Sequence, residues 1–217
     1  MKKQTRPLNL KESKALIKIR SSADKDLRRG YKAHYFLVAI VVGSACVYLA
    51  NWTKYDFLTF VFGTIAVLSF SFVVFMPYEI YKDLKRAKLK SKEIDDILHA
   101  NIIDVTPIRA KQIAVAKEYE DEGDLYIVEI EDGNILYLWD NDYNLRKNFP
   151  CLEFEIYSKD FYKLIGWEIN PLTDKFKPIV IDAKAKWAYM KKIGGPEHLT
   201  IEKKDFKNLV EQINNVA

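Results

Sequence analysis

Two uncharged apolar stretches follow one another closely in the first half of this 217-residue chain, and they limit what it can fold into. The first covers residues 33–53 and the second covers residues 57–78. A helix rises about 1.5 Å per residue and the hydrocarbon core of a bilayer is roughly 30 Å thick, so each stretch is long enough to cross a membrane. A helix in the core of a soluble protein would show a polar face, and neither stretch does. The sequence therefore predicts two transmembrane helices.

The short connection between the stretches, residues 54–56, predicts a tight antiparallel hairpin with almost nothing exposed on the far side of the membrane. Residues 1–32 carry eleven Lys or Arg against three Asp or Glu, and the segment after the second stretch is also basic. Because basic flanks stay on the cytoplasmic side, both termini should lie in the cytoplasm. We therefore expect a two-pass protein of the cell membrane.

Charge is divided along the chain, since residues 1–117 have a balance of +11 and residues 118–145 have a balance of −10. A Lys or Arg close to an anionic leaflet contributes about 1 kcal/mol to membrane attraction. Anionic lipid headgroups are the expected partner of the basic segment, whose candidate membrane-surface residues are Lys82, Lys85, Arg86 and Lys88. A nucleic-acid partner is not expected, because the basic residues follow the membrane ends and form no platform with stacking aromatics.

Small residues recur at helical spacing in both stretches, where they let helix backbones approach closely. The candidate packing residues are Ala39 and Gly43 in the first stretch and Gly63 and Ala66 in the second. Packing within the hairpin is the favoured interpretation, and self-association into a homo-oligomer is the alternative. Neither stretch contains Asp, Glu, Lys or Arg, and their only histidine, His34, stands at the start of the first stretch, which argues against a transporter.

Residues 79–100 continue the helical pattern beyond the second stretch. Apolar or small side chains recur there at steps of three and four, at Ile80, Leu84, Ala87, Ser91, Ile94 and Leu98. An amphipathic helix needs a partner for this stripe. The segment around Leu16, Ile19 and Leu27 is the favoured partner, with the lipid interface or another copy of the chain as alternatives.

From about residue 101 the pattern changes to short runs of period two with turn signals between them, which indicates a β-rich domain. The expected strands cover residues 113–117, 125–131, 135–139, 152–157, 165–169 and 179–181, and a helix follows Asp205. The alternating runs predict strands with one buried face and one wet face. The fold class is therefore α+β, a two-helix transmembrane hairpin followed by a cytoplasmic β-rich domain with a C-terminal helix.

These patterns divide the chain into six parts. They are a basic cytoplasmic N-terminal segment (1–32), transmembrane helix 1 (33–53), a short external turn (54–56), transmembrane helix 2 (57–78), a basic juxtamembrane helix (79–100) and a cytoplasmic β-rich domain (101–217).

Three segments of the last part, residues 121–126, 133–138 and 149–155, resemble domains of uncharacterised bacterial membrane-associated proteins. A few strands followed by a C-terminal helix are also similar to the membrane-associated PH-like folds of bacteria. The resemblance implies no activity, because function depends on a site and not on a fold.

Residues for chemistry are few. Cys151 and His198 could form a nucleophile and base pair, but a packing role for the thiol at the start of an alternating strand is the favoured interpretation. The run that begins at Asp140 imitates a calcium loop, yet Leu145 stands where glycine is needed. Residues 118–124 predict a solvated acidic loop that could meet a basic partner or hold a divalent cation loosely. We expect no cofactor, no specific metal site and no enzymatic activity.

The leading hypothesis is a membrane-anchored interaction or regulatory protein that presents its cytoplasmic domain to an unknown protein partner. The candidate partner-binding residues, expected on an exposed acidic rim, are Asp121, Asp124, Trp139 and Asp142. The alternative hypothesis is an oligomeric membrane-disrupting or pore-forming effector, suggested by the small-residue stripes and the minimal external turn.

Overall fold

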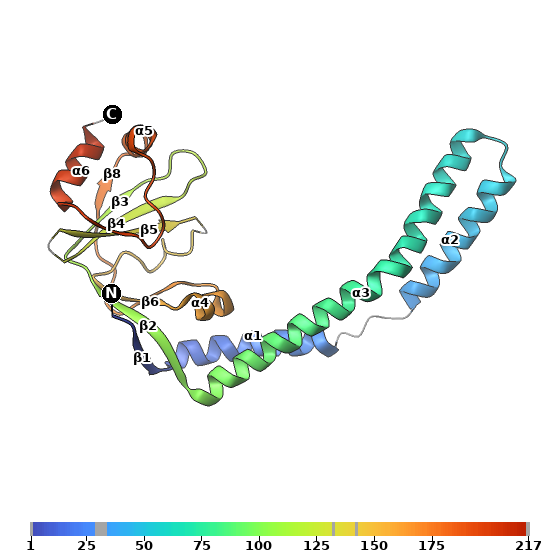
Figure 1. Ribbon diagram of the computed structural model, residues 1–217, viewed down its shortest axis with the longest axis horizontal. Coiled ribbons are helices and arrows are strands. Elements are labelled where there is room, and N and C mark those ends of the chain that lie inside the picture. Colours follow the sequence, from blue (N-terminus) through green and yellow to red (C-terminus); the bar gives the residue numbers. More distant parts are fainter. Residues whose placement is uncertain (1, 29–33, 132, 142, 216–217) are drawn as a thin grey trace. The chain divides into compact units, whose positions relative to one another are not determined.

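Residues from both ends of the chain build one of its two structural units. The computed structural model describes residues 2–28, 34–131, 133–141 and 143–215. Residues 9–101 form the helical unit, and residues 1–8 join residues 102–217 in the globular unit (Figure 1). The first residues of the chain therefore belong with a domain that lies about a hundred residues further along the sequence.

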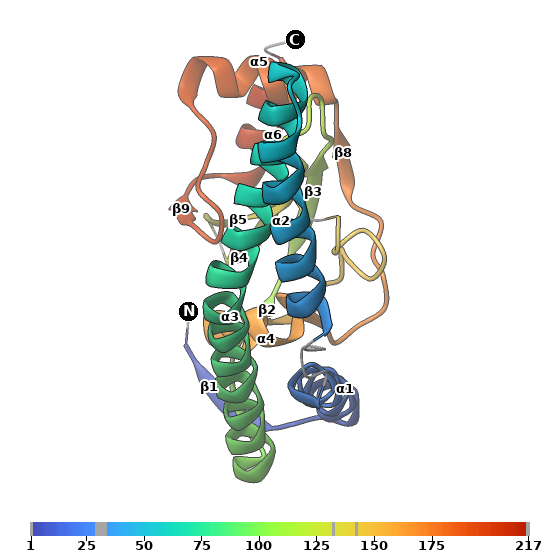
Figure 2. The same ribbon diagram turned by 90° about the vertical axis from the view of Figure 1, so that its right-hand side faces the viewer.

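The helical unit contains α1 (Leu10–Arg28), α2 (His34–Trp52) and α3 (Asp56–Ala100). Helix α2 runs beside the first part of α3 as an antiparallel pair joined by a short turn (Figures 1 and 2). Both α2, of 19 residues, and α3, of 45 residues, are long and apolar enough to cross a membrane. Helix α3 continues without interruption past Pro77, which confirms that the second apolar stretch extends as a helix.

The apolar stripe in the second half of α3 packs against α1. Leu16 of α1 and Ile94 of α3 have no exposed surface. Polar contacts flank this seam, since Ser91 Oγ donates to Asp24 Oδ1 at 3.3 Å and Arg20 Nε lies 2.8 Å from Asp95 Oδ1. The favoured partner for the stripe, a segment of the same chain, is therefore confirmed.

Helix α1 begins with a reciprocal capping box. The Asn9 N–H donates to Glu12 Oε2 at 2.7 Å, and the Glu12 N–H donates to Asn9 Oδ1 at 2.9 Å. Two amide groups that would otherwise lack partners at the first turn are satisfied in this way. Two residues separate the start of α1 from the end of β1 (Gln4–Pro7), the first strand of the chain.

The globular unit is an α+β fold with two sheets. The first sheet, sheet A, has the order β1-β2-β6-β7 and is antiparallel throughout. It consists of β1, β2 (Ile102–Arg109), β6 (Glu153–Tyr157) and β7 (Ile169–Pro171). The second, sheet B, has the order β8-β3-β4-β5-β9, and only its β8 pairs in parallel, with β3. It consists of β3 (Gln112–Ala116), β4 (Asp124–Glu131), β5 (Asn134–Asp140), β8 (Ile179–Ile181) and β9 (Ile201–Lys203).

Three helices complete the globular unit: α4 (Lys159–Ile165), α5 (Ala183–Ile193) and α6 (Phe206–Asn214). Helix α6 is the predicted C-terminal helix, and its N-cap Asp205 accepts from the Asn208 N–H at 2.8 Å. Figure 1 shows α5 and α6 beside sheet B and α4 next to β6.

Sheet B is buried on both faces, because one face packs on sheet A and the other packs on α5 and α6. Phe149 and Phe154 lie in the cluster between the sheets, and Phe149 meets the rings of Tyr126 and Phe154 edge-on at centroid distances of 4.9 and 5.1 Å. Ile127 and Phe206 lie in the second cluster, under α5 and α6. The interior therefore consists of two apolar layers separated by one sheet.

This layering corrects the expectation of one wet face for each alternating strand. Residues 124–128 of β4 are all buried, since α5 and α6 cover the face that was expected to meet water. On β6, Glu155 and Tyr157 are buried too. Arg6 from β1 reaches Glu155 through Nε at 2.8 Å, and Asn170 donates to the same carboxylate at 2.9 Å.

Other predicted boundaries were wrong. Residues 165–169 do not form a strand: α4 ends at Ile165, Gly166 turns the chain with a φ of +81°, and β7 begins only at Ile169. Residues 1–32 are not one basic segment, because residues 4–7 form an edge strand that pairs with β2. This pairing joins residues about a hundred positions apart, so no local pattern indicates it.

Candidate functional site

The acidic loop, residues 118–124 between β3 and β4, is held by buried charges and is not simply solvated. Asp124 has no exposed surface. Its carboxylate accepts from the Glu118 N–H and from Arg146 Nε, both at 3.0 Å, and Lys117 Nζ lies 3.5 Å away. The prediction that Asp124 lies on an exposed partner-binding rim is therefore wrong.

The partners of Asp124 decide its ionisation. Burial by itself would raise the pKa of the carboxyl, but the Glu118 N–H and the Arg146 guanidinium favour the charged form more strongly. The pKa of Asp124 is consequently lowered from its ordinary value of 3.8. A charged Asp124 thus joins the start of β4 to Arg146, in the segment after β5.

A second buried charge, Lys186 of α5, also contacts the acidic loop. Its side chain is 1% exposed, and Nζ lies 2.9 Å from both Glu122 Oε1 and the Gly123 carbonyl oxygen. Burial tends to raise the pKa of Glu122, but the hydrogen bond and the charge of Lys186, together with the backbone N–H groups of Glu120 and Tyr119, outweigh it, and the net pKa is lowered. A buried lysine is costly unless it is paired in this way.

Trp139 belongs to the same arrangement and is not a free contact residue. Lys186 Nζ lies 5.4 Å from the centroid of its ring, and the indole Nε1–H donates to the Pro196 carbonyl at 2.8 Å. The side chain is half-buried and packs against the cluster under α5 and α6. Of the predicted rim, Asp121 is exposed, whereas Asp142 lies outside the described residues.

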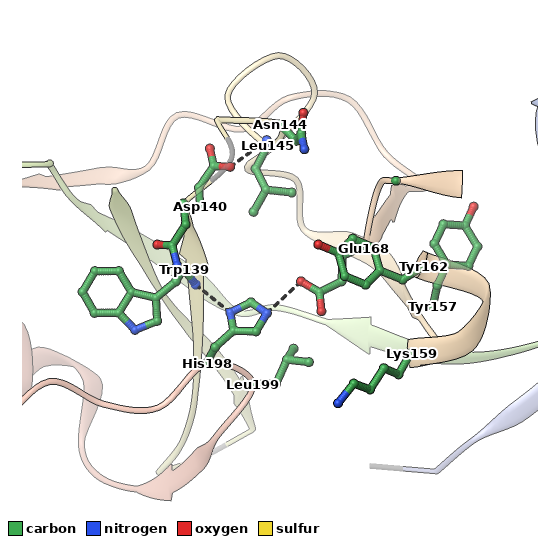
Figure 3. Close-up of a pocket in the computed structure, with 12 residues that line it drawn as sticks. Trp139, Asp140, Asn144, Leu145, Tyr157, Lys159, Tyr162, Glu168, His198 and Leu199 are labelled. Atoms are coloured by element: carbon green, nitrogen blue, oxygen red, sulfur yellow. Dashed lines mark hydrogen bonds and ion pairs between the residues drawn. The ribbon is translucent and has the colours of Figure 1, made fainter. Parts of the chain in front are cut away.

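A cavity of about 400 Å³ lies between β5 and the β6–α4–β7 segment of the globular unit, and we call it the His198 cavity (Figure 3). Its lining residues are Trp139, Asp140, Asn141, Asn144, Leu145, Tyr157, Lys159, Tyr162, Gly166, Glu168, His198 and Leu199. They come from three separated parts of the sequence, so only the folded chain brings them together.

His198 crosses this cavity with both ring nitrogens engaged. The Trp139 backbone N–H donates to Nδ1 at 3.0 Å, and Nε2 lies 2.8 Å from Glu168 Oε2. Because Nδ1 accepts, Nε2 carries the hydrogen and donates it to Glu168. Neither nitrogen is left to act as a base toward a nucleophile in this arrangement (Figure 3).

Asp140 stands at the edge of the cavity beside Leu145 (Figure 3). It is 3% exposed, and its Oδ1 accepts from the Leu145 N–H at 3.1 Å. Its Oδ2 is the one buried side-chain polar atom without a hydrogen-bond partner among the described residues. Burial, together with the carboxylates of Asp124 and Asp140, raises the pKa of Tyr126, so this phenol stays protonated.

Cys151 does not form the nucleophile and base pair with His198. The thiol is fully buried, its Sγ lies 3.4 Å from the Glu153 carbonyl oxygen, and it is absent from the lining of the His198 cavity. Burial raises the pKa of Cys151, which lowers the fraction of reactive thiolate. This burial fits the packing role that the sequence predicts for the Cys151 side chain.

The candidate residues of the helical unit differ in their surroundings. A Cβ on Gly43 would lie 3.2 Å from Phe70 Cζ and from Ser69 Cβ, and Ala66 is 4% exposed, so both face the α2–α3 contact. Ala39 is half-buried. A Cβ on Gly63 would meet nothing within 4 Å, which excludes Gly63 from this close approach.

Most of the basic side chains in the second half of α3 are exposed. Lys82 lies 3.6 Å from Glu79 and Arg86 lies 3.7 Å from Asp83, distances typical of weak exposed pairs. Lys85 and Lys88 are exposed. The segment thus retains cationic side chains that an anionic surface can reach.

Comparison with known proteins gives no assignment, because no protein-family model, curated protein or solved structure matches the chain. The resemblance to bacterial membrane-associated domains therefore stays a prediction. Within the described residues no group of three or more His, Cys, Asp or Glu is placed to hold a metal ion.

Sequence reasoning missed the charged residues that matter most in the globular unit: Arg146, Lys159, Glu168 and Lys186. One signal for Lys186 was available, because Asp182 caps α5 by accepting from the Lys184 N–H at 2.8 Å, and an N-cap aspartate marks a helix start. No comparable signal existed for Glu168 or Lys159, because only the folded chain brings them to a cavity that they share with residues of β5 and with His198.

Proposed function

We propose that this chain is a two-pass membrane protein that holds its globular unit at the cytoplasmic surface of the cell membrane, where that unit engages a protein partner. The apolar residues 33–53 and 57–78 cross the bilayer, residues 54–56 form the external turn, and both termini are cytoplasmic. The protein acts as an interaction or regulatory module.

The observation that carries the proposal is the exposed apolar surface of α2 and α3. Within α2 and α3, ten large side chains from Leu37 to Phe75 are each more than 60% exposed, namely Leu37, Val41, Tyr48, Trp52, Phe57, Phe60, Val67, Leu68, Val74 and Phe75. Burying one such side chain is worth about 1.5–3 kcal/mol, so leaving ten in water would cost on the order of 20 kcal/mol. A whole domain is stable by only about 5–15 kcal/mol. Insertion of α2 and α3 into lipid removes this cost, because the ten apolar side chains then no longer face water.

The flanks of the pair support the cytoplasmic placement of both ends. The exposed Lys85 and Lys88 of α3, with Lys82 and Arg86 nearby, suit contact with anionic headgroups at about 1 kcal/mol per residue. Among the described residues, no Asp, Glu, Lys or Arg lies between His34 and Thr53 or between Phe57 and Tyr78. This charge distribution matches the positive-inside rule for a hairpin with cytoplasmic ends.

Membrane extraction tests the anchor. The full chain should remain in the membrane pellet after alkaline carbonate treatment, and Leu68→Lys should reduce that retention, because a lysine at the centre of a spanning helix costs about 2.5–3.5 kcal/mol on insertion. Lys85→Ala is the matched control and should stay in the pellet. Release of the unaltered chain into the carbonate supernatant would contradict the proposal.

The partner surface is tested at the exposed part of the acidic loop. Glu120 and Asp121 are exposed, so neutral Glu120→Gln and Asp121→Asn should reduce crosslinked partner recovered from cells, while Glu211→Gln on α6 should not. Equal recovery from all variants would dismiss this surface without affecting the membrane anchor.

The alternative, an oligomeric pore-forming or membrane-disrupting effector, has less support. Gly43 and Ala66 already face the contact within the α2–α3 pair. The hydroxyls of Thr59 and Thr64 donate to the carbonyls of Tyr55 and Phe60, at 3.2 and 2.9 Å, and so contribute little to a polar lumen. Dye leakage from vesicles that contain the purified chain would favour the alternative.

A further inference from the structure

The lining of the His198 cavity holds two carboxylates, Asp140 at its edge and Glu168, and one lysine, Lys159, which is paired with neither of them in the part of the chain that the structure describes. Among the described residues, the Glu168 carboxylate contacts His198 through Oε2, and Oε1 is left for another donor. Lys159 is exposed and has no ion-pair or hydrogen-bond partner among the residues that the structure describes. In Figure 3 the Lys159 side chain extends from the start of α4 and ends below Leu199, and the Glu168 carboxylate, from the segment before β7, points at His198.

The Glu168 carboxylate is fixed before any ligand arrives. The Trp139 N–H of β5 holds His198 Nδ1 at 3.0 Å, and Nε2 of the same ring holds Glu168 at 2.8 Å. Glu168 is also mostly buried, with a side chain only 17% exposed. A charged group held in this way loses little freedom when it binds a ligand, which is the advantage of preorganisation.

The fixed Glu168 carboxylate and the Lys159 ammonium group together select the kind of ligand. A simple cation would be attracted by Glu168 but repelled by Lys159. A simple anion would be attracted by Lys159 but repelled by Glu168. A dipolar molecule satisfies both groups. The ring of Tyr162 and the side chains of Leu145 and Leu199 add an apolar wall for the rest of the ligand. The volume of about 400 Å³ lies within the usual range for small-molecule sites.

We propose that the His198 cavity binds a small zwitterion of the free amino-acid type. Its ammonium group donates to Glu168 Oε1, its carboxylate accepts from Lys159 Nζ, and its side chain lies against Tyr162 and Leu145. His198 is a positioning residue, which orients Glu168 through Nε2. This inference goes beyond the proposed membrane anchoring and does not depend on it, since every lining residue belongs to the globular unit.

Titration calorimetry on the full chain in detergent tests the ligand class. Each of the common free L-amino acids is titrated at millimolar concentration, and at least one should bind. For that amino acid, the amide lacks the carboxylate and the N-acetyl form lacks the ammonium group. Each analogue should bind about tenfold more weakly or worse, because each loses one charge-assisted hydrogen bond. Failure of every amino acid to bind, or equal binding of the analogues, overturns the proposal.

Paired variants locate the site. Glu168→Gln removes the charge but keeps an acceptor for His198 Nε2, and Lys159→Met keeps most of the side-chain length. Both should weaken the amino acid that binds by about tenfold or more. Lys163→Met on α4 and Glu211→Gln on α6, both exposed and outside the cavity, should bind as the unaltered chain does. A melting curve of each variant confirms folding. Unchanged affinity in folded Glu168→Gln and Lys159→Met overturns the proposal.

Discussion

The helical unit and the globular unit handle charge in opposite ways. The α2–α3 pair keeps ionisable residues out of its apolar region and directs large apolar side chains outward. The globular unit encloses its apolar side chains and also buries charged ones, including Asp124, Glu155 and Lys186. Each of these three contacts an oppositely charged side chain. The globular unit therefore satisfies these buried charges internally, whereas the apolar region of the α2–α3 pair has no such charges to satisfy.

Of the substitutions that test this difference, replacement of Lys186 should cause the largest loss of unfolding free energy. Lys186→Ala leaves Glu122 and the Gly123 carbonyl without their buried donor, and breaking a buried ion pair in this way costs about 3–5 kcal/mol. Urea unfolding of the full chain in detergent, followed by tryptophan fluorescence, measures the loss. Lys184→Ala, at an exposed position of the same helix, should cost less than about 0.5 kcal/mol. Similar values for the two variants would show that Lys186 does not hold the acidic loop.

Asp124→Asn should cost about 2–3 kcal/mol at neutral pH, because Arg146 loses a charge-assisted partner. The folded pKa of Asp124 is lowered, so the stabilisation by its charge is fully present above the ordinary value of 3.8 and is lost as the pH falls through the folded pKa. The difference in unfolding free energy between the unaltered chain and Asp124→Asn should therefore shrink in acid. Asp121→Asn, at an exposed position, should change little at any pH. A constant difference down to strongly acidic pH would contradict the assigned ion pair.

Gly43 and Gly63 give a sharper test of packing in the helical unit. Gly43→Leu must displace Phe70 or Ser69, since even a Cβ would lie 3.2 Å from each, and overpacking typically costs about 1–3 kcal/mol. Gly63→Leu meets open space and should be neutral or slightly stabilising. The melting of the helical signal in far-UV circular dichroism compares the two variants. Equal losses would remove Gly43 from the α2–α3 contact.

The smallest effect is expected at the exposed pair between α1 and α3. Arg20 and Asp95 lie 2.8 Å apart with side chains 46% and 43% exposed, and exposed pairs contribute about 0.2–1 kcal/mol. A double-mutant cycle with Arg20→Ala and Asp95→Ala should give a coupling in that range, which falls with added salt. A coupling several times larger, or one insensitive to salt, would show that the pair is shielded from solvent in the folded chain.

The helical unit was largely predictable from sequence because its signals are local. The apolar runs, the continuation of α3 and the pairing of its stripe with the segment around Leu16 all follow from periodicity within short windows. Even there, spacing alone could not separate Gly43, which faces Phe70, from Gly63, which faces open space.

The globular unit was predictable only in part. Five of its strands, β3, β4, β5, β6 and β8, and the last helix carry local patterns, whereas β1 exists only because residues 4–7 pair with β2. The candidate site depends still more on long-range contacts. Asp124 was expected in water, but Lys117 and Arg146 approach it from both sides of the hairpin, and the His198 cavity joins three distant segments.

The central claim is that the α2–α3 pair crosses the membrane and leaves the globular unit in the cytoplasm. Labelling of single cysteines by a membrane-impermeant thiol reagent tests it most directly, in a chain that carries Cys46→Ala and Cys151→Ala. Lys54→Cys reports on the turn and Glu120→Cys reports on the acidic loop. Lys54→Cys should be labelled in intact cells and Glu120→Cys only in inverted vesicles. Labelling of both from the same side would contradict the account.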